Sequence, residues 1–263
     1  MSLRLRQICL VAADLAATEK LFADVLDLPV CFRDTAVGKF GLENILCPVG
    51  FSFLEVVAPK ADAADTAAGR YLARRGGDGG YMVILQTSDQ KHPIYRQRVA
   101  DRGIRIVNDM DYGDFHGMQF HPRDVGAAIL EIDRNDLDPD DPTRPDQPWH
   151  PAGGTGWRDL EPSSLITAFR AAELQSNDPQ ALAERWADIL DRPLATDAHA
   201  NPCIHLDDAT LRFVPIRDGR GEGLGGLDLA CADADEVMRR AQAARCVVGD
   251  DVVMACGMRL KLV

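Results

Sequence analysis

Several features that would assign this chain to a class of protein directly are missing from it. No CxxC pair occurs among its cysteines, there is no GxSxG or HExxH motif, and no GK[ST] follows the glycine-rich stretch GGDGG at 76–80. No apolar run reaches the roughly 20 residues that a membrane-spanning helix needs. The apolar start of the chain is short and interrupted by Asp14, so it does not predict a signal peptide. These absences argue against a zinc or disulfide framework, a P-loop and a membrane anchor.

Basic residues are also scarce relative to acidic ones. The chain has 29 Lys and Arg against 41 Asp and Glu, which gives a formal net charge of -12. Such a surface repels phosphate backbones and anionic membranes, so we expect neither nucleic acid nor a membrane as a partner. The seven cysteines are dispersed and mostly in apolar contexts, as is typical of free thiols in a reducing compartment. We therefore expect a cytoplasmic protein.

The chain does contain an internal repeat. Residues 7–29 align with residues 171–193, and both segments read as an apolar strand, an Asp, a helix, a short turn and a Pro. Asp14 and Asp178 stand just ahead of the two helices, where a carboxylate can accept the free N–H groups of the first turn. Two weaker copies begin near Gly80 and Gly226.

A β-α-β-β-β pattern is therefore predicted four times along the chain. The copies cover 3–58, 79–133, 164–216 and 222–263. In the first copy the three strands after the helix are expected at PVCFRDT (29–35), ENILCP (43–48) and FSFLEVVA (51–58). We predict two domains, 1–134 and 163–263, joined by a linker at 135–162 that is rich in Pro, Asp and Gly. Trp149 and Trp157 are expected to pin this linker onto a domain surface.

Two segments carry a resemblance to a known superfamily. The strand, Asp and helix that end on ADVLDLP (23–29) resemble the opening of vicinal-oxygen-chelate proteins, the superfamily of glyoxalases, bleomycin-resistance proteins and dioxygenases. The segment FHPRDVGAAILEID (120–133) is similar to the closing hairpin of its epimerase-like and glyoxalase-like members. The resemblance implies an α+β fold, in which four βαβββ modules pair into two curled, cup-like mixed β-sheets with helices on the outside. Sequential and swapped pairing of the modules both stay open, as do a monomer and a homodimer.

The resemblance also implies a metal site in the N-terminal cup. Members of the superfamily hold a divalent ion with residues from the first and last strands of each module. The matching positions here are Gln7, Glu55 and Glu131, with Met82 at the fourth. One ion (Mn, Ni, Zn or Fe) is implied there. None is expected in the C-terminal domain, where the matching positions are Ala171, Phe213, Gly226 and Lys261.

Glu55 and Glu131 also stand out by themselves, because each lies inside an apolar strand. Burying an isolated carboxylate is costly unless it is paired or bound to a metal. If the two converge without a metal, one of them should have a raised pKa and could serve as an acid or base. We predict both as catalytic residues, and we predict Met82, His121 and Tyr81 as substrate contacts. For His121, a bond to the local backbone of its turn is the alternative.

The predicted function is proton abstraction next to a carbonyl, of the lyase or isomerase type, on a small substrate with vicinal oxygens. Glu131 or Glu55 would act as the base. A metal-free protein that binds or sequesters a small molecule, as bleomycin-resistance members do, is the main alternative. Ring cleavage of the dioxygenase type and a scaffold with filled cups are two further alternatives.

Overall fold

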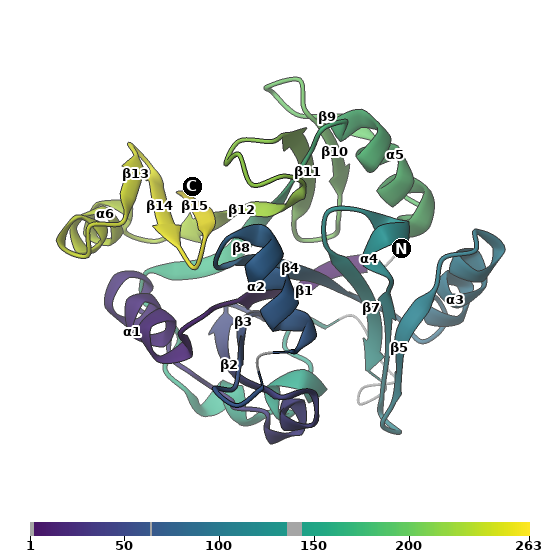
Figure 1. Cartoon of the computed structure of the whole chain (residues 1–263), viewed down its shortest axis with the longest axis horizontal. Helices are drawn as coiled ribbons and strands as arrows, with labels where there is room; N and C mark the ends of the chain where they lie inside the picture. Colours follow the sequence, from purple (N-terminus) through teal and green to yellow (C-terminus); the bar gives the residue numbers. More distant parts are fainter. Residues whose placement is uncertain (1–2, 64, 136–143) are drawn as a thin grey trace.

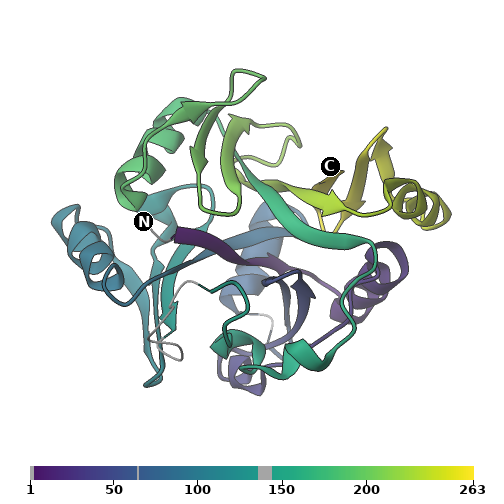
Figure 2. The same ribbon diagram turned by 180° about the vertical axis from the view of Figure 1, so that it is seen from behind.

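A computed structural model describes residues 3–63, 65–135 and 144–263 of the chain. Its strands join into one mixed sheet of 15 strands, which confirms the α+β class. The sheet is curled rather than flat, and Figures 1 and 2 show α1, α3, α5 and α6 around its outside, whereas the helix at Ala67–Arg75 lies near the middle. None of the helices in the described part of the chain is long and apolar enough to cross a membrane.

The first two modules form the N-terminal half of the sheet. The first consists of β1 (Leu3–Val11), α1 (Leu15–Leu26), β2 (Leu42–Val49) and β3 (Ser52–Pro59). The second consists of β4 (Gly79–Thr87), α3 (His92–Asp101), β5 (Ile106–Asp111), β6 (Phe115–Phe120), α4 (Pro122–Val125) and β7 (Ile129–Asn135). An additional helix, α2 (Ala67–Arg75), lies between the two modules.

One predicted strand is wrong. The segment 29–35 forms only an isolated bridge between Phe32 and Leu46, and then enters the 3-10 helix η1 (Thr35–Phe40). The Asp34 side chain accepts the backbone N–H of Ala36, and the Asn44 side chain accepts the N–H of Asp34. Side chains therefore satisfy the backbone groups that a neighbouring strand would otherwise have paired.

The C-terminal half repeats the arrangement. Its third module consists of β8 (Ile166–Ser176), α5 (Pro179–Leu190), β9 (Ala195–Thr196), β10 (Pro202–His205) and β11 (Thr210–Pro215). Its fourth consists of β12 (Gly223–Cys231), α6 (Ala234–Ala243), β13 (Val247–Gly249), β14 (Val252–Ala255) and β15 (Met258–Leu262). Asp14 and Asp178 cap α1 and α5 as predicted, accepting the N–H groups of Ala17 and Ala181.

The modules pair in sequence order. Within each half the first strands of the two modules run antiparallel side by side, β1 with β4 and β8 with β12. Each first strand also pairs in parallel with the last strand of its own module, as β1 does with β3 and β4 with β7. The halves meet where Leu224 of β12 pairs with Gly80 of β4. A Cβ at Gly80 would lie 2.5 Å from the Leu224 side chain, so only glycine allows this approach.

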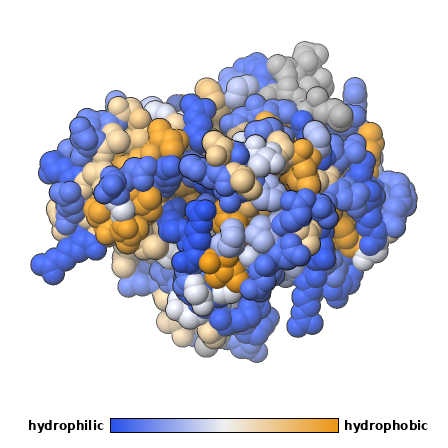
Figure 3. All heavy atoms as spheres, turned by 90° about the horizontal axis from the view of Figure 1, so that it is seen from above, coloured by the Kyte–Doolittle hydropathy of each residue, from blue (hydrophilic) through white to orange (hydrophobic). Residues whose placement is uncertain are grey.

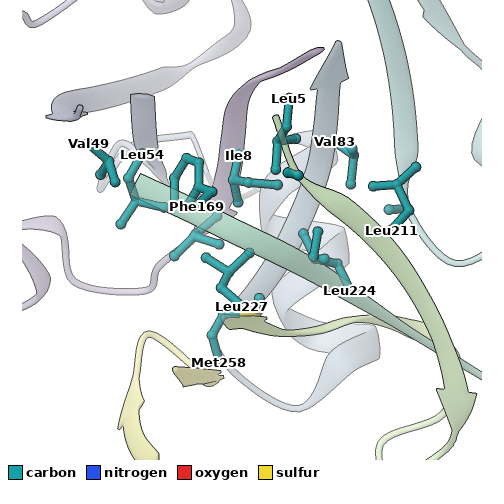
Figure 4. Close-up of a cluster of buried hydrophobic side chains, with 14 of the residues drawn as sticks. Leu5, Ile8, Val49, Leu54, Val83, Phe169, Leu211, Leu224, Leu227 and Met258 are labelled. Carbon is teal, nitrogen blue, oxygen red and sulfur yellow. The ribbon is translucent and has the colours of Figure 1, made fainter. Parts of the chain in front are cut away.

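Each half has a helix face, which packs on its helices, and an inner face on the opposite side. The helix faces of both halves share one core, to which Leu5, Ile8, Phe169, Leu224 and Leu227 belong (Figure 4). Helices α1 and α6 contact each other across the halves, as do α3 and α5. The outer surface is mostly hydrophilic with separate apolar patches (Figure 3).

The inner face of the N-terminal half has its own buried cluster. Its strands contribute Phe53, Met82 and Phe115, and α2 contributes Tyr71. The described part of the predicted linker includes the 3-10 helices η2 (His150–Ala152) and η3 (Gly156–Asp159). Its two tryptophans pin it onto the N-terminal half as predicted, since Trp149 is 0% and Trp157 7% exposed within this same cluster. The linker thus forms part of the wall of the inner face.

Candidate site on the inner face of the N-terminal half

Strand alternation places most of the predicted site residues on one face. Gln7 and Cys9 of β1 lie opposite Phe53 and Glu55 of β3 in the parallel register. Alternation in β3 is as the sequence suggests: Phe53 and Val57 belong to the inner cluster, whereas Leu54 and Val56 belong to the helix-face core. On the other pair of strands, Ile84 lies opposite Glu131 and Gln86 opposite Asp133.

Glu55 sits in a closed hydrogen-bond network. The Gln7 side-chain amide donates to Glu55 Oε2 at 2.9 Å, and the Asn44 amide donates to Oε1 at 2.7 Å. Burial raises the pKa of Glu55, and the hydrogen bonds from Asn44, Cys9 and Gln7 partly oppose that shift. Both carboxylate oxygens therefore already have donors from within the protein.

The linker covers this network from above. Trp149 Nε1 donates to Gln7 Oε1 at 2.7 Å, so the third polar oxygen of the network is also occupied. Arg6 holds the linker in place, because its guanidinium donates to the carbonyl oxygen of Gln147 at 2.8 Å and stacks on the Trp149 ring. The Trp157 ring packs edge-on against Phe53.

Glu131 is paired with a residue that the sequence analysis did not single out. Glu131 and Asp133 are 3% and 0% exposed and project from β7 to the same face. They lie close enough to share a hydrogen bond when one is protonated. Burial raises the pKa of Glu131, and the Glu55 charge adds to the shift; burial and the Glu131 charge raise the pKa of Asp133. Hydrogen bonds from Asp133 and Gln119 partly oppose the shift at Glu131.

Polar atoms without partners surround this pair. Among the residues that the structure describes, Glu131 Oε2, both Asp133 oxygens, both side-chain polar atoms of Gln86 and Asn135 Oδ1 have no hydrogen-bond partner. Gln86 and Asn135 are each 1% exposed. Gly117 of β6 provides the room, since a Cβ there would lie 2.6 Å from Asp133 Oδ1. Such a set of buried, unsatisfied oxygens is unusual and calls for a ligand, a proton or a cation.

The three predicted substrate contacts lie in different surroundings. Met82 is buried in the inner cluster, and Tyr81 packs against the same cluster with its ring edge-on to Tyr71. Burial raises the pKa of Tyr81 to about 12. His121 is the N-cap of α4, and its Nδ1 accepts the backbone N–H of Arg123 at 3.1 Å. That is the local backbone bond given above as the alternative for His121.

The inner face of the C-terminal half is built differently. Glu173 of β8 accepts from Arg259 at 2.7 Å, Arg217 at 3.1 Å and Arg212 at 3.3 Å. Arg212 also holds Asp228 of β12 with two bonds of 2.7 and 2.8 Å.

One C-terminal position taken above as a match to a ligand is on the wrong side of the sheet. Phe213 packs on Trp186 at the helix face. Its neighbour in β11, Arg212, occupies the inner face, because adjacent strand residues point to opposite sides.

The metal set implied by the resemblance does not fit the residues as they lie. Gln7 Oε1 and both Glu55 oxygens are taken by hydrogen bonds, so a cation there would have to displace Trp149, Gln7 or Asn44. In addition, no cluster of three or more His, Cys, Asp or Glu side chains suited to a metal occurs in the described ranges. The structure does not test whether a metal binds, and Mn, Ni, Zn or Fe stays a prediction.

Asp133, Gln86, Gln119 and Asn44 are the site residues that sequence reasoning missed. Asp133 could have been found, because it lies two residues after Glu131 in ILEID and so shares its face. Gln86 follows Met82 by four residues in one strand, and this even spacing likewise places both side chains on the same face. Nothing in the local sequence around Asn44 points to Glu55, because only the pairing of β2 with β3 brings them together.

Comparisons with known proteins support the fold. No protein-family model and no curated protein matches the sequence. The structure of a hypothetical protein from Staphylococcus aureus matches over 100% of this chain and 99% of its own, with a TM-score of 0.65 and 11% identity.

Methylmalonyl-CoA epimerases match about half of the chain. The Mycobacterium tuberculosis enzyme does so over 49% of this chain and 85% of its own, at 20% identity and a TM-score of 0.42. A methylmalonyl-CoA epimerase in complex with methylmalonyl-CoA and NH4+ covers 51% of this chain and 94% of its own, at 19% identity and a TM-score of 0.43. At these values the S. aureus structure shows a shared overall fold, and the epimerase matches add no argument about function.

Proposed function

We propose that this chain is a vicinal-oxygen-chelate protein that transfers a proton next to a carbonyl of a small substrate, on the inner face of its N-terminal half. The observation that carries the proposal is the buried Glu131–Asp133 pair with Gln86 beside it. Arg6 and Trp157 of the same inner face also have one nitrogen each without a described partner, but both Glu55 oxygens have donors, whereas Glu131 Oε2 and both Asp133 oxygens have none. Small-molecule binding, a cytoplasmic location and a monomer or homodimer belong to the same proposal.

The geometry supports different roles for Glu131 and Gln86. Glu131 would act as the base that takes the proton from carbon, because its Oε2 has no partner in the described part of the protein. The free N–H groups of Gln86 would donate to the oxygen on which negative charge develops, as in an oxyanion hole. Return of the proton from Glu131 to the same carbon would give exchange with solvent, and its delivery to the neighbouring carbon of the enolate would give an isomer. Gln119, which is half-buried next to Glu131, would lie on the path from solvent.

A second candidate function is binding without turnover. The network of Gln7, Glu55 and Asn44 is complete without a metal, and Trp149 closes it. Aromatic rings from the strands and from the linker pack against it. A cup filled in this way fits a protein that only binds a ligand at its remaining open end.

Hydrogen–deuterium exchange at carbon separates the two functions. The protein would be incubated in D2O with a panel of 2-hydroxy and 2-oxo carbonyl compounds and acyl thioesters, and loss of the proton next to the carbonyl would be followed by NMR. We expect exchange with the wild type and at least a ~100-fold slower rate for Glu131→Gln, since a general base contributes about that much. Asp228→Asn serves as the control, because Asp228 is an inner-face carboxylate of the other half. Ligand binding without exchange would favour the second candidate.

A further inference from the structure

We infer that Asp133, Gln86 and Asn135, together with Glu131, form a binding site for a hard cation such as Mg²⁺, Ca²⁺ or Mn²⁺. The site differs from the set that the superfamily resemblance implies: of Gln7, Glu55 and Glu131 it shares only Glu131. It goes beyond the proposed function, because a cation can bind here whether or not a substrate is turned over.

The first support is charge. Two carboxylates lie on adjacent inward positions of β7, and both are almost completely buried. The groups that affect their ionisation are each other, Glu55 and Gln119, and no Lys or Arg is among them. An uncompensated charge in such a place is costly, and a bound cation would remove that cost.

The second support is a neutral side chain that points to a ligand. Gln86 is opposite Asp133 in the parallel pair of β4 and β7, and side chains of such partners project to the same face. It is 1% exposed, and neither its Oε1 nor its Nε2 has a partner among the described residues. An amide buried in this state forfeits the free energy of two hydrogen-bonding groups unless something occupies the space next to it.

The third support is the kind of ligand atom. The oxygens without described partners come from Glu131, Asp133, Gln86 and Asn135, and Asn135 is oriented by donating its amide to the Pro148 carbonyl. Carboxylate and amide oxygens without sulfur or imidazole select Mg²⁺, Ca²⁺ or Mn²⁺ over Zn²⁺ or Ni²⁺. Gly117 keeps the space open, since any side chain there would run into Asp133.

The position is also favoured over the Gln7 and Glu55 end of the same face. There each oxygen has a donor within 2.9 Å, and the Trp149 ring lies over the network. A cation at that end would break existing hydrogen bonds. A cation between Glu131 and Asp133 would replace only the proton that the two carboxyls can share, because Glu131 Oε2 and both Asp133 oxygens have no other partner among the described residues.

Direct binding of the ion tests the site without any assay of turnover. Chelator-treated protein would be dialysed against Mn²⁺, Ca²⁺, Mg²⁺ or Zn²⁺ up to millimolar concentration, bound metal measured by elemental analysis, and Mn²⁺ followed by electron paramagnetic resonance. We expect stoichiometric Mn²⁺ or Ca²⁺, and at least a ~100-fold weaker affinity in Asp133→Asn and Gln86→Leu, because loss of a ligand should cost at least as much as loss of an outer contact. Asp228→Asn, an inner-face carboxylate of the other half, is the matched control and should bind as the wild type does.

Three outcomes would overturn the site. The first is no bound cation in the wild type. The second is binding that Glu55→Gln abolishes but Asp133→Asn does not, which would move the ion to the Gln7 end. The third is a preference for Zn²⁺ over Mn²⁺ and Ca²⁺. Thermal unfolding in chelator checks that each variant folds, and Gln86→Leu, which keeps the volume without the polar atoms, is the variant expected to fold best. Loss of exchange at carbon with intact cation binding would contradict the proposed function alone.

Discussion

The inner faces of the two halves both carry a pair of acidic side chains, but among the described residues only the C-terminal pair is held by arginines. In the C-terminal half, Glu173 and Asp228 are held by Arg212, with Arg217 and Arg259 completing the set. In the N-terminal half, Glu131 and Asp133 lie beside Gln119 and Gln86, and no Lys or Arg of the described residues is among the groups that shift their pKa values. The central strands pair in the same way in both halves, so the difference lies in the side chains and in the linker and α2, which cover only the N-terminal face.

Buried carboxylates that have a neighbouring cation differ in role from those that have none. A buried carboxylate with well-placed arginines is part of the structure, and removing one partner exposes the cost of burying the other. A carboxylate pair without a counter-charge lowers stability and is retained where it serves binding or proton transfer. The comparison therefore fits a structural role for the C-terminal acids and is consistent with the proposal that the N-terminal pair binds a ligand or transfers a proton.

The largest effect is expected from breaking the compensation in the C-terminal half. Arg212→Leu leaves Asp228 and part of Glu173 without a partner, and we expect the free energy of unfolding to fall by about 3 kcal/mol. Gln86→Leu, the matched change on the N-terminal face, should cost less than about 1 kcal/mol, because its amide has no partner to lose. Urea unfolding at neutral pH measures both. Equal losses in the two variants would mean that the faces do not differ in compensation.

The next effect concerns pH. The pKa values of Glu131 and Asp133 are raised in the folded protein, so the folded state keeps a proton that the unfolded chain releases above about pH 4. The free energy of unfolding should therefore fall as the pH rises from about 4 towards the raised pKa values of the two carboxyls. Asp133→Asn removes part of that loss. We expect its free energy of unfolding to exceed that of the wild type by about 1–3 kcal/mol at pH 8 and by much less near pH 4.

Urea unfolding at the two pH values, with a chelator present, checks this prediction. Asp228→Asn provides the contrast, since its carboxylate is ion-paired and its loss should destabilise the protein at pH 8. The opposite result would contradict this interpretation of the N-terminal pair. It would be a wild type that gains stability over Asp133→Asn as the pH rises from 4 to 8.

The scaffold was more predictable from the sequence than the site. Repeated helices with an Asp at their start and apolar strands follow local rules, and those rules place α1 and α5 correctly. In β11 the predicted position was wrong by one residue, because Phe213 lies on the helix face. The strand predicted at 29–35 fails because Asp34 and Asn44 satisfy the backbone there through side chains.

The site depends on contacts between distant segments, which no local pattern contains. Trp149 reaches Gln7 across 142 residues, and Asp133 lies opposite Gln86 only through the register of β4 with β7. Inward-facing acids could be identified from alternation, as Glu55 and Glu131 were. Whether an arginine, an amide or a tryptophan stands next to them could not, because that is decided by strand pairing and by the path of the linker.

The smallest predicted effect concerns the helix caps, a feature in which the two halves should not differ. Asp14 and Asp178 cap α1 and α5 with hydrogen bonds of 2.9 and 3.0 Å to the third residue beyond each cap. Each accepts one N–H group that would otherwise lack a partner, so Asp14→Ala and Asp178→Ala should each lower the free energy of unfolding by about 1 kcal/mol. Urea unfolding of both variants, compared with Asp14→Asn, which keeps a capping oxygen, measures the effect. If the losses in the free energy of unfolding of the two alanine variants differed by much more than about 1 kcal/mol, the scaffolds of the halves would differ too. The asymmetry could then not be attributed to the inner faces alone.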